Sequence, residues 1–325
     1  MELARRHFMQ QAAGAATLAF GSRAAHPQSY PARPVRLVVG FTPGGGNDIV
    51  ARIIGQWLSD RLGQSFVVDN KPGAASSIAA ELVVRAAPDG YTLLFVGLAH
   101  ATNATLYENL TYNFVRDIAP VCGLISYPNV MVVHPSLPAT TVPEFLAYGR
   151  AHPGKVNVSS AGNGSAGHLC AELLKMMTGV ELVHIPYRGN GPALADLLAG
   201  QVTVTFASSS SAMGYVASGK LRALAVTGAE RIESLPDVPT IAEFVPGYEM
   251  TAWYGIGAPR NTPAEIVDTL NREINSALAA SDMKARFTEL GGTVLRGSPA
   301  DFARLIASDT EKWAKVIKFA GIKLT

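Results

Sequence analysis

Two glycine-rich segments carry the residue types best suited to binding an anion through the backbone. The first runs from Phe41 to Asp48, contains three successive glycines, and follows the apolar run at residues 35–40. Glycines let successive backbone N–H groups converge, and the N-terminus of a following helix adds partial positive charge. The segment therefore predicts an anion site made of backbone. Its candidate residues are Phe41, Pro43, Gly44, Gly45 and Asp48.

An ordinary turn between a strand and a helix is the alternative interpretation of this first segment. In that case Asn47 or Asp48 is the N-cap of the helix and has no ligand. The segment lacks the Lys and the hydroxyl of the G-x-x-x-x-G-K-[ST] pattern, which argues against a nucleoside triphosphate. The residues alone leave both interpretations open.

The second segment repeats this design about 120 residues later. A strand is predicted at residues 156–160, and a helix from His168 to Thr178. His168 either donates to the anion or lies on the surface at the start of the helix. Two such turns in one chain predict two lobes that face a shared cleft. The candidates here are Ser160, Ala161, Gly162, Asn163, Gly164, Ser165 and His168.

Two enzyme-type motifs resemble this second segment, and each lacks a required part. The match to G-x-G-x-x-G needs an acidic residue at the end of the next strand, whereas Glu181 stands at its beginning. A serine hydrolase needs G-x-S-x-G, and Ser165 does not have that spacing. Backbone N–H groups and the Ser165 hydroxyl holding a carboxylate explain the residues better. An exported hydrolase that uses Ser165 and His168 stays open as the alternative function.

Two further positions are suited to a ligand. Asn103 follows the predicted strand at residues 92–96, at the strand end where open α/β sheets bind ligands. Tyr187 begins a turn between a strand and a helix, which would place its phenol in the cleft. A loop-capping Asn103 and a surface turn at Tyr187 are the respective alternatives.

No metal site or cofactor is predicted, because His100, His134 and His184 are isolated along the sequence. Cys122 and Cys170 fit no zinc or redox spacing. They could form a disulfide in an oxidising compartment, but burial as small apolar residues is the favoured interpretation.

Length and charge limit the function classes. The chain has 325 residues and 48% hydrophobic content, enough for two α/β domains. The formal net charge is +2 without a basic run, which argues against a nucleic-acid partner. No apolar segment reaches the length of a membrane span.

The first 25 residues resemble a twin-arginine export signal. Arg5 and Arg6 precede a weakly apolar stretch at residues 12–20, and small residues around Ala24 offer a cleavage site. A buried helix is the alternative. Export followed by removal of the signal predicts a periplasmic location.

Apolar runs alternate with helical segments in a way that predicts an α/β fold with parallel sheets. The chain is expected to cross between lobes near residues 123–129 and to return near 248–255. Lobe one would then comprise residues 26–126 and 251–325, with lobe two (127–250) as an insertion, a topology suited to closure on a ligand. The expected strands are 35–40, 65–69, 92–96, 130–134, 156–160, 182–186, 202–206 and 221–227.

The C-terminal part is expected to be helical. Apolar residues four apart predict a helix at 266–278, capped by Thr262 with Pro263 in its first turn. A second helix is expected at 283–290, and a last one opens at Ser298 and Pro299.

Seven short motifs in this order resemble those of the solute receptors of tripartite tricarboxylate transporters, also called Bug receptors. The resemblance extends from about residue 34 to residue 321. The motifs lie at residues 43–48 (PGGGND), 70–74 (NKPGA), 88–93 (PDGYTL), 160–165 (SAGNGS), 186–189 (PYRG), 235–240 (LPDVPT) and 253–255 (WYG).

The resemblance implies a two-lobed, type II periplasmic-binding-protein fold with a small carboxylate between the lobes. It implies an extracytoplasmic solute-binding receptor rather than an enzyme, a monomer without cofactor, whose partners are the transporter's membrane components. Carried over from the family, the cradle comprises the two glycine-rich turns together with Ala75, Ser76, Ser77, Thr102 and Asn103.

Two departures from the family pattern concern the far end of the ligand. Many members have Asp where this chain has Ala207, followed by Ser208 and three more serines, and that Asp meets a ligand amine. Members commonly have Asn where this chain has Ser77. A polar or aromatic monocarboxylate, or a dicarboxylate that uses the hydroxyls, is therefore expected rather than an amino ligand. Its far end would be contacted by Phe41, His168, Tyr187 and the serines from Ser208 to Ser211.

Overall fold

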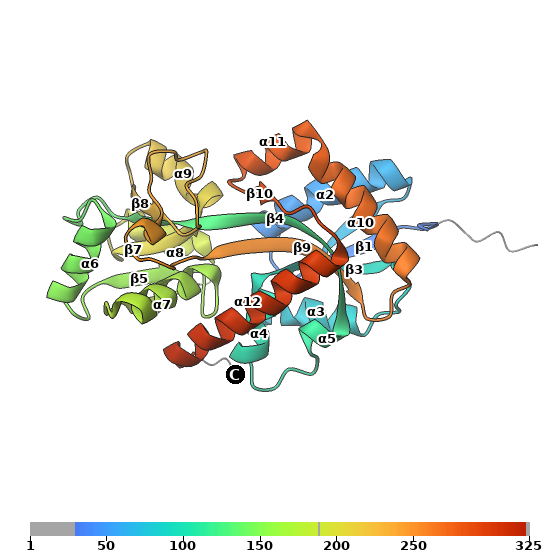
Figure 1. Ribbon diagram of the computed structural model, residues 1–325, viewed down its shortest axis with the longest axis horizontal. Coiled ribbons are helices and arrows are strands. Elements are labelled where there is room, and N and C mark those ends of the chain that lie inside the picture. The colour runs from blue at the N-terminus through green and yellow to red at the C-terminus, as the bar shows by residue number, and fades with distance from the viewer. Residues whose placement is uncertain (1–29, 188, 323–325) are drawn as a thin grey trace, which may run out of the picture.

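The computed structural model describes residues 30–187 and 189–322, so the signal predicted at residues 1–25 lies outside the described residues. Figure 1 shows two groups of helices and strands at opposite ends of an elongated molecule. Two long strands, β4 (Ile118–Val133) and β9 (Thr251–Pro259), run along the middle between these two lobes.

The first lobe contains a mixed sheet in the order β2-β1-β3-β9-β4. Strand β1 is parallel to β2 and β3, whereas β9 is antiparallel to β3 and β4, and β10 is antiparallel to β4. The strands are β1 (Val35–Val39), β2 (Phe66–Asn70), β3 (Thr92–Gly97) and β10 (Thr293–Val294). The helices are α2 (Gly46–Leu62), the short 3₁₀ turn η1 (Ala74–Ser76), α3 (Ser77–Val84), α4 (Leu98–Leu106), α5 (Phe114–Asp117), α10 (Ala264–Ala279) and α11 (Ser281–Glu289).

The second lobe is built on the last part of β4, which is antiparallel to β7 and β8. Strand β5 lies between β7 and β6 and is parallel to both. The strands are β5 (Asn157–Ser160), β6 (Val183–Pro186), β7 (Val204–Ser208) and β8 (Arg222–Val226). The helices are α6 (Val142–Ala151), α7 (Ala166–Thr178), α8 (Asn190–Leu198), α9 (Ser209–Ala217) and the 3₁₀ turn η2 (Ile241–Glu243).

Strand β4 belongs to both sheets. Its residues from Ile118 to Pro128 pair with β9, and its residues from Asn129 onward pair with β7. The sequence predicted a short strand at 130–134 and parallel sheets. Strands β1–β3 and β5–β7 are parallel as expected, but β4 is much longer than predicted and is antiparallel to β9 and β7. Proline and glycine weaken the strand signal at 118–128. The structure accommodates them with register shifts after Pro120 and after Gly123.

Helix α12 (Pro299–Ala320) packs against α4 in one lobe, α7 in the other, and β4. Its predicted start is confirmed, because Ser298 Oγ accepts the Asp301 N–H at 3.2 Å while Asp301 Oδ2 accepts the Ser298 N–H at 2.8 Å. Trp313 and Ile317 bury its apolar face.

Two smaller expectations had opposite outcomes. Thr262 does not cap α10, whose N-cap is Pro263; the Thr262 hydroxyl instead donates to the Pro259 carbonyl at 2.7 Å. Cys122 and Cys170 are both free and buried, which confirms the apolar interpretation. Burial raises the pKa of the Cys122 thiol to about 12.

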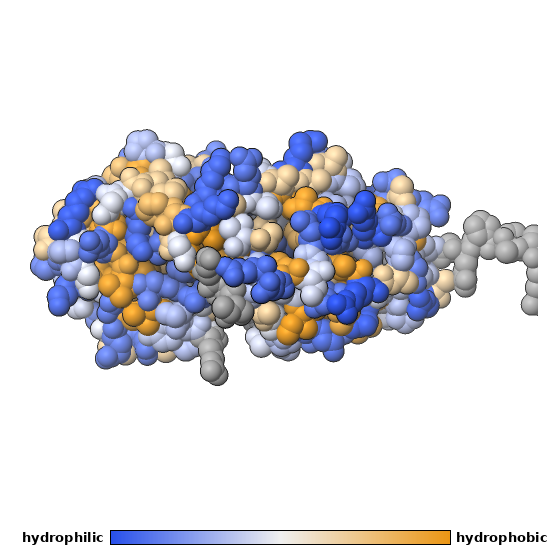
Figure 2. All heavy atoms as spheres, turned by 90° about the horizontal axis from the view of Figure 1, so that it is seen from below, coloured by the Kyte–Doolittle hydropathy of each residue, from blue (hydrophilic) through white to orange (hydrophobic). Residues whose placement is uncertain are grey.

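The length and hydropathy of the described helices decide whether any of them could span a membrane. No helix within residues 30–187 and 189–322 is long and apolar enough to cross a membrane. Figure 2, seen from below, shows hydrophilic residues across that face, with apolar residues gathered in separate patches.

A half-buried hydrogen bond joins α12 to β9. The Trp253 indole Nε1 donates to Asp309 Oδ2 at 2.6 Å, and its ring meets Phe302 edge-on with centroids 5.3 Å apart. Burial raises the pKa of Asp309 above its ordinary value, although the Trp253 hydrogen bond and Lys312 oppose this shift. The indole N–H therefore satisfies a carboxylate that is largely removed from water.

We expect Trp253→Phe to lower the free energy of unfolding by about 1–3 kcal/mol at pH 7, because Asp309 loses its donor. The folded pKa of Asp309 is raised, so its protonated form adds stability at low pH, and this contribution is lost as the pH rises through that pKa. Without the Trp253 N–H, the ionised Asp309 carboxylate destabilises the folded state further. The loss of unfolding free energy in Trp253→Phe should therefore be larger at pH 7 than at pH 4. Urea unfolding at both pH values measures it.

Trp57→Phe is the matched control, because the Trp57 indole donates to the Glu273 backbone carbonyl, which does not titrate. The decrease in the free energy of unfolding caused by Trp57→Phe should be the same at pH 4 and pH 7. Equal losses for Trp253→Phe at pH 4 and pH 7 would contradict the role given to Asp309.

Candidate functional site

The predicted residues follow the carboxyl ends of the strands in both lobes. In the first lobe, residues 41–48 follow β1, residues 74–77 follow β2, and α4 follows β3. In the second lobe, residues 161–165 follow β5, and Tyr187 follows β6. Because β1, β2 and β3 are parallel, and β5, β6 and β7 likewise, these segments emerge at the edges where open α/β sheets bind ligands.

The loops of the two lobes touch at two places where a glycine permits it. A Cβ at Gly164 would lie 2.4 Å from Cδ1 of Leu106, the last residue of α4. The second place is between α9 and the loop after α11. Ser209 Oγ donates to the Gly291 carbonyl at 3.4 Å, and a Cβ at Gly291 would lie 1.8 Å from Ser209 Oγ. The first contact sets the glycine-rich turn of the second lobe against α4, and the second joins α9 to that loop.

The first turn is held from within by Asp48. Its carboxylate accepts hydrogen bonds from the Gly44 N–H (2.9 Å), from Arg52 (2.9 Å) and from Asn70 Nδ2 (3.0 Å). The helix N-cap is Gly45, without a side-chain cap, so the expectation that Asn47 or Asp48 is the N-cap was wrong. Asp48 instead fixes the loop just before the N-cap.

Asp48 is buried but ionised at ordinary pH. Burial alone would raise the pKa of its carboxyl, but the hydrogen bonds from Arg52, the Gly44 N–H and Asn70 hold it below the ordinary value. Asn70 Nδ2 also donates to the Phe41 carbonyl at 3.0 Å, which ties the end of β2 to the start of the turn. The charge of Asp48 is thus neutralised by Arg52 and does not repel an anion at full strength.

The outer surface of the first turn is open. Pro43, Gly44 and Gly45 are exposed and Phe41 is half-buried. A Cβ at Gly44 would meet no atom within 4 Å, and one at Gly45 only the Thr42 carbonyl at 3.8 Å. The glycines therefore leave room for a molecule to approach the backbone closely.

The segment after β2 forms an unusual left-handed turn. Ala74, Ala75 and Ser76 have φ angles of 44°, 48° and 76°. Such conformations are costly for residues other than glycine and persist only where neighbours enforce them. Asn103 Nδ2 donates to the Ala75 carbonyl at 2.9 Å and to Ser77 Oγ at 3.0 Å. Asn103, only 1% exposed, therefore supports the turn from behind.

The neighbouring candidate Thr102 is also buried and donates to the Ala99 carbonyl at 3.0 Å. Its hydroxyl is used within α4. The structure therefore brings Ala75, Ser77 and Asn103 together, while Thr102 contributes to the helix.

The glycine-rich turn of the second lobe is also supported from below. Ser160 Oγ accepts the Gly162 N–H at 3.1 Å and lies 2.6 Å from His184 Nε2. The Gly164 N–H donates to His168 Nδ1 at 3.1 Å. Ala161 and Gly162 are half-buried, whereas Asn163 is exposed at the tip.

His168 is buried at 4% exposure, so its interpretation as a surface residue was wrong. Its ring stacks on His184 with centroids 3.6 Å apart. Burial and then His168 lower the pKa of His184 to about 4, which leaves this ring neutral at pH 7. His168 Nε2 faces Glu172 Oε1 at 3.7 Å, and Glu172 is paired with Lys175 at 2.8 Å.

The hydrolase alternative requires a Ser165 hydroxyl bonded to an imidazole. Ser165 Oγ instead accepts the His168 backbone N–H at 3.5 Å as the N-cap of α7. His168 Nδ1 is bonded to the Gly164 N–H. These contacts build the turn, and the two side chains do not form the hydrogen bond that a nucleophile and its base need.

The residues predicted to contact the far end of the ligand mostly interact with other residues of the second lobe. The Tyr187 hydroxyl donates to Asp196 Oδ2 of α8 at 2.5 Å. Ala207 is buried at 2% exposure, and Ser208 Oγ contacts Ser211 Oγ at 2.7 Å. This end of the candidate site therefore presents hydroxyl groups and an alanine.

Sequence reasoning missed four supporting residues, namely Arg52, Asn70, His100 and His184. Asn70 belongs to a motif that was recognised, but its bonds to Phe41 and Asp48 depend on the fold. The described residues contain no group of three or more His, Cys, Asp or Glu side chains placed to hold a metal ion.

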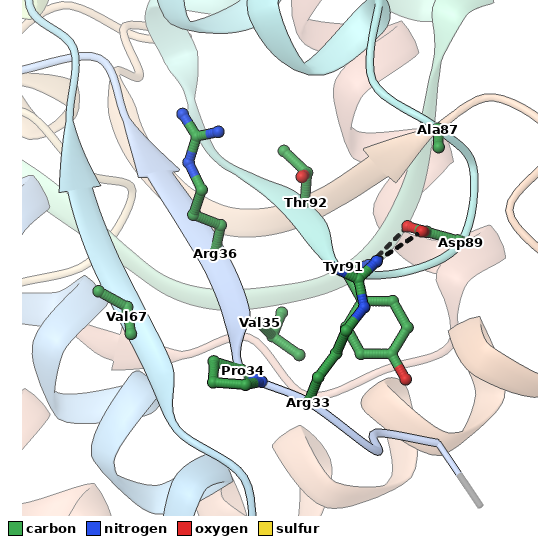
Figure 3. Close-up of a pocket in the computed structure, with 9 residues that line it drawn as sticks. All are labelled: Arg33, Pro34, Val35, Arg36, Val67, Ala87, Asp89, Tyr91 and Thr92. Carbon is green, nitrogen blue, oxygen red and sulfur yellow. Dashed lines mark hydrogen bonds and ion pairs between the residues drawn. The ribbon is translucent and has the colours of Figure 1, made fainter. Parts of the chain in front are cut away.

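An open pocket of about 500 Å³ lies at the opposite, amino ends of β1 and β3 (Figure 3). Its arginines are already paired, Arg33 with Asp89 at 3.0 Å and Arg36 with Asp69 at 2.7 Å. Arg33 also lies over the Tyr91 ring, 4.0 Å from its centroid. The pocket is thus separate from the candidate turns.

Comparison with known families identifies the class. Residues 50–322 match the Tripartite tricarboxylate transporter family receptor, and the chain belongs to this family. The protein BugT of Bordetella pertussis is 36% identical over 299 residues, covering 91% of this chain and 92% of BugT.

Solved structures agree on the fold. The R. palustris protein Rpa4515, solved with adipate, has a TM-score of 0.84 and 41% identity, covering 90% of this chain and 99% of that one. MatC from Rhodopseudomonas palustris, solved with malate, has a TM-score of 0.80 and 35% identity, covering 89% and 100%. The periplasmic binding protein BugD also has a TM-score of 0.80, at 34% identity, covering 90% and 99%. The two-lobed periplasmic-binding-protein fold expected from the sequence is confirmed.

We expect Asp48→Asn to lower the free energy of unfolding by about 1–3 kcal/mol at pH 7, because the charged bonds to Arg52 and the Gly44 N–H are weakened. The folded pKa of Asp48 is lowered, so its contribution is present above the unfolded pKa and is lost as the pH falls through the folded value. The difference from wild type should therefore shrink in acid. Chemical denaturation between pH 7 and pH 3 measures it.

Asp60→Asn, on the exposed face of the same helix, is the control, because Asp60 accepts a hydrogen bond from the exposed Gln56 side chain at 2.8 Å. It should change stability by less than about 0.5 kcal/mol. A loss for Asp48→Asn that is no larger than this would show that Asp48 does not hold the turn.

Proposed function

We propose that this chain is an extracytoplasmic receptor that captures a small carboxylate between its lobes and delivers it to the membrane components of a tripartite tricarboxylate-type transporter. The observation that carries the proposal is the set of three turns at the carboxyl ends of strands, at residues 41–48, 74–77 and 160–165. None contains Lys or Arg, so their backbone N–H groups supply the positive potential. The family membership supports the same reading.

The proposed organisation follows from β4 and β9. Lobe one comprises residues 26–126 and 251–325, and lobe two comprises residues 127–250. The change of partner along β4 at Asn129 and the start of β9 at Thr251 support these boundaries. The receptor works as a periplasmic monomer after removal of residues 1–25.

The proposed ligand is a dicarboxylate without an ammonium group. Relatives have been solved with adipate and with malate, both dicarboxylates. At the far end, a buried Ala207 stands beside the Ser208 and Ser211 hydroxyls, which are neutral donors. A buried ammonium against Ala207 would be costly without an acceptor.

Isothermal titration calorimetry on the mature chain, freed of retained ligand by unfolding and refolding, tests this proposal. We expect adipate or malate to bind, and aspartate to bind at least tenfold more weakly than malate, which differs by a hydroxyl in place of the amine. Native mass spectrometry of gently purified protein identifies any retained ligand. Tight binding of aspartate would refute the ligand class, and turnover abolished by Ser165→Ala would refute the receptor.

We further expect Gly45→Val to reduce the affinity at least tenfold while the protein keeps its fold. Gly45 has φ −80° and ψ 168°, which valine adopts readily, and an added Cβ would lie 3.8 Å from the Thr42 carbonyl oxygen, an ordinary contact. The added side chain would occupy the space through which the ligand reaches the backbone. Calorimetry and thermal unfolding measure the two effects.

Gly214→Val in α9 is the matched control, because nothing lies within 4 Å of a Cβ at that position. It should bind the ligand as the wild type does. Normal binding by Gly45→Val would exclude the first turn from the site.

A further inference from the structure

The left-handed turn at Ala74–Ser76 needs an external constraint. Three successive residues with side chains have positive φ angles, and Gly73 before them has φ 137°. Local preference would return alanine and serine to the right-handed or extended regions. Whatever holds the turn therefore decides where its N–H groups and the Ser76 hydroxyl point.

The turn is seated on the end of β1. A Cβ at Gly40 would lie 1.7 Å from Ser76 Oγ, so the serine hydroxyl occupies the space of the missing side chain. Gly40 immediately precedes Phe41 and the first glycine-rich turn. The position of Ser76 is therefore coupled to the proposed ligand site through a direct backbone contact.

His100 contacts the hydroxyl from α4. It is 1% exposed, its Nε2 lies 3.0 Å from Ser76 Oγ, and its ring packs near Phe114 with centroids 5.2 Å apart. Burial lowers the pKa of His100 to about 4, so the ring carries one proton at pH 7. Whether that proton is on Nδ1 or Nε2 decides whether His100 Nε2 donates to Ser76 Oγ or accepts from it.

The tautomer of His100 follows from its second contact. Nδ1 lies 3.1 Å from the Gly97 nitrogen and 3.2 Å from the Gly97 carbonyl oxygen. Gly97 is the N-cap of α4, and its backbone N–H points at Nδ1 in a capping-box arrangement, so a proton on Nδ1 would face that N–H. We therefore assign the Gly97 N–H as the donor to Nδ1. The ring proton is then on Nε2 and is donated to Ser76 Oγ.

We propose that His100, as the Nε2–H tautomer, is a positioning residue that fixes the left-handed turn beside the proposed ligand site. Ser76 itself is 0% exposed, so it acts through the shape of the turn. Its hydroxyl accepts the hydrogen bond from His100. Asn103, which holds the Ala75 carbonyl, is the second support of the same turn. The ligand part of this inference rests on the proposed function, whereas the turn and the tautomer do not.

Three variants separate the roles. His100→Leu removes the donor, His100→Gln keeps an N–H donor at a similar reach, and Ser76→Ala removes the acceptor with little change in volume. His152→Leu, at an exposed histidine in the second lobe, is the control. Amide hydrogen exchange at residues 74–77 reports the turn, imidazole ¹⁵N shifts report the tautomer, and adipate calorimetry reports binding.

We expect His100→Leu and Ser76→Ala each to speed exchange at residues 74–77 at least tenfold and to weaken binding at least tenfold. The double variant should be no worse than either single variant, because both remove one hydrogen bond. His100→Gln should stay within about threefold of the wild type, and His152→Leu should be unchanged.

The inference would be overturned if amide exchange at residues 74–77 were unchanged in Ser76→Ala. It would also be overturned if the ¹⁵N shifts of the wild-type protein placed the His100 proton on Nδ1. Ser76→Ala keeps the histidine in the core, so it decides the question even where His100→Leu does not fold. If the wild type binds no carboxylate, the proposed function fails, while exchange and the ¹⁵N shifts still decide whether His100 positions the turn.

Discussion

The antiparallel pairing of β4 with β9 is the interaction on which the rest of the structure depends. These strands carry the chain into and out of the second lobe, and β4 then continues as a strand of the second sheet. Asn129 secures the point of exchange, because its Nδ2 donates to the Phe206 carbonyl at 2.9 Å and its N–H to Thr227 Oγ1 at 2.8 Å. Every candidate turn is positioned relative to this shared strand.

The turns themselves are shaped by buried polar side chains that bind backbone groups from the inner side. Asp48 binds the Gly44 N–H, Ser160 binds the Gly162 N–H, and His168 binds the Gly164 N–H. Each bond fixes the orientation of the peptide units beside it, so these loops need no ligand to adopt a defined shape. Satisfied polar networks of this kind rigidify a structure, whereas partly satisfied ones would destabilise it.

Local sequence signals predicted the parts of the fold that depend on neighbours in the chain. Strands β1 and β5 were predicted within a residue, because β-branched runs end there at glycine-rich turns. Strand β9 was missed, because glycines and a proline interrupt its pattern and its stability comes from long-range pairing. The left-handed turn at Ala74–Ser76 was not predictable, since alanine and serine do not favour that region.

The supporting residues of the site could not be found for a related reason. His100 and His184 look isolated in the sequence, yet their partners Ser76 and Ser160 lie 24 residues away and meet them only after the sheets form. Asn70 and Asp48 are likewise 22 residues apart. The glycine-rich turns could be predicted because their residue types carry the signal, whereas their supports are ordinary residues until the fold brings them together.

If the lobes close on a ligand as proposed, helix α12 constrains the axis of that rotation. It has 22 residues, about 33 Å of stiff helix, and packs on α4 of one lobe and α7 of the other, below β4 and β9 in Figure 1. A rotation axis close to this helix disturbs the fewest buried side chains, because atoms near an axis move least. The displacement then grows toward α9 and α11 on the opposite side, where Ser209 meets Gly291 through a single long hydrogen bond. Under the proposed function, the ligand would then enter from the α9 edge, while Leu106 and Gly164 stay nearly fixed relative to each other.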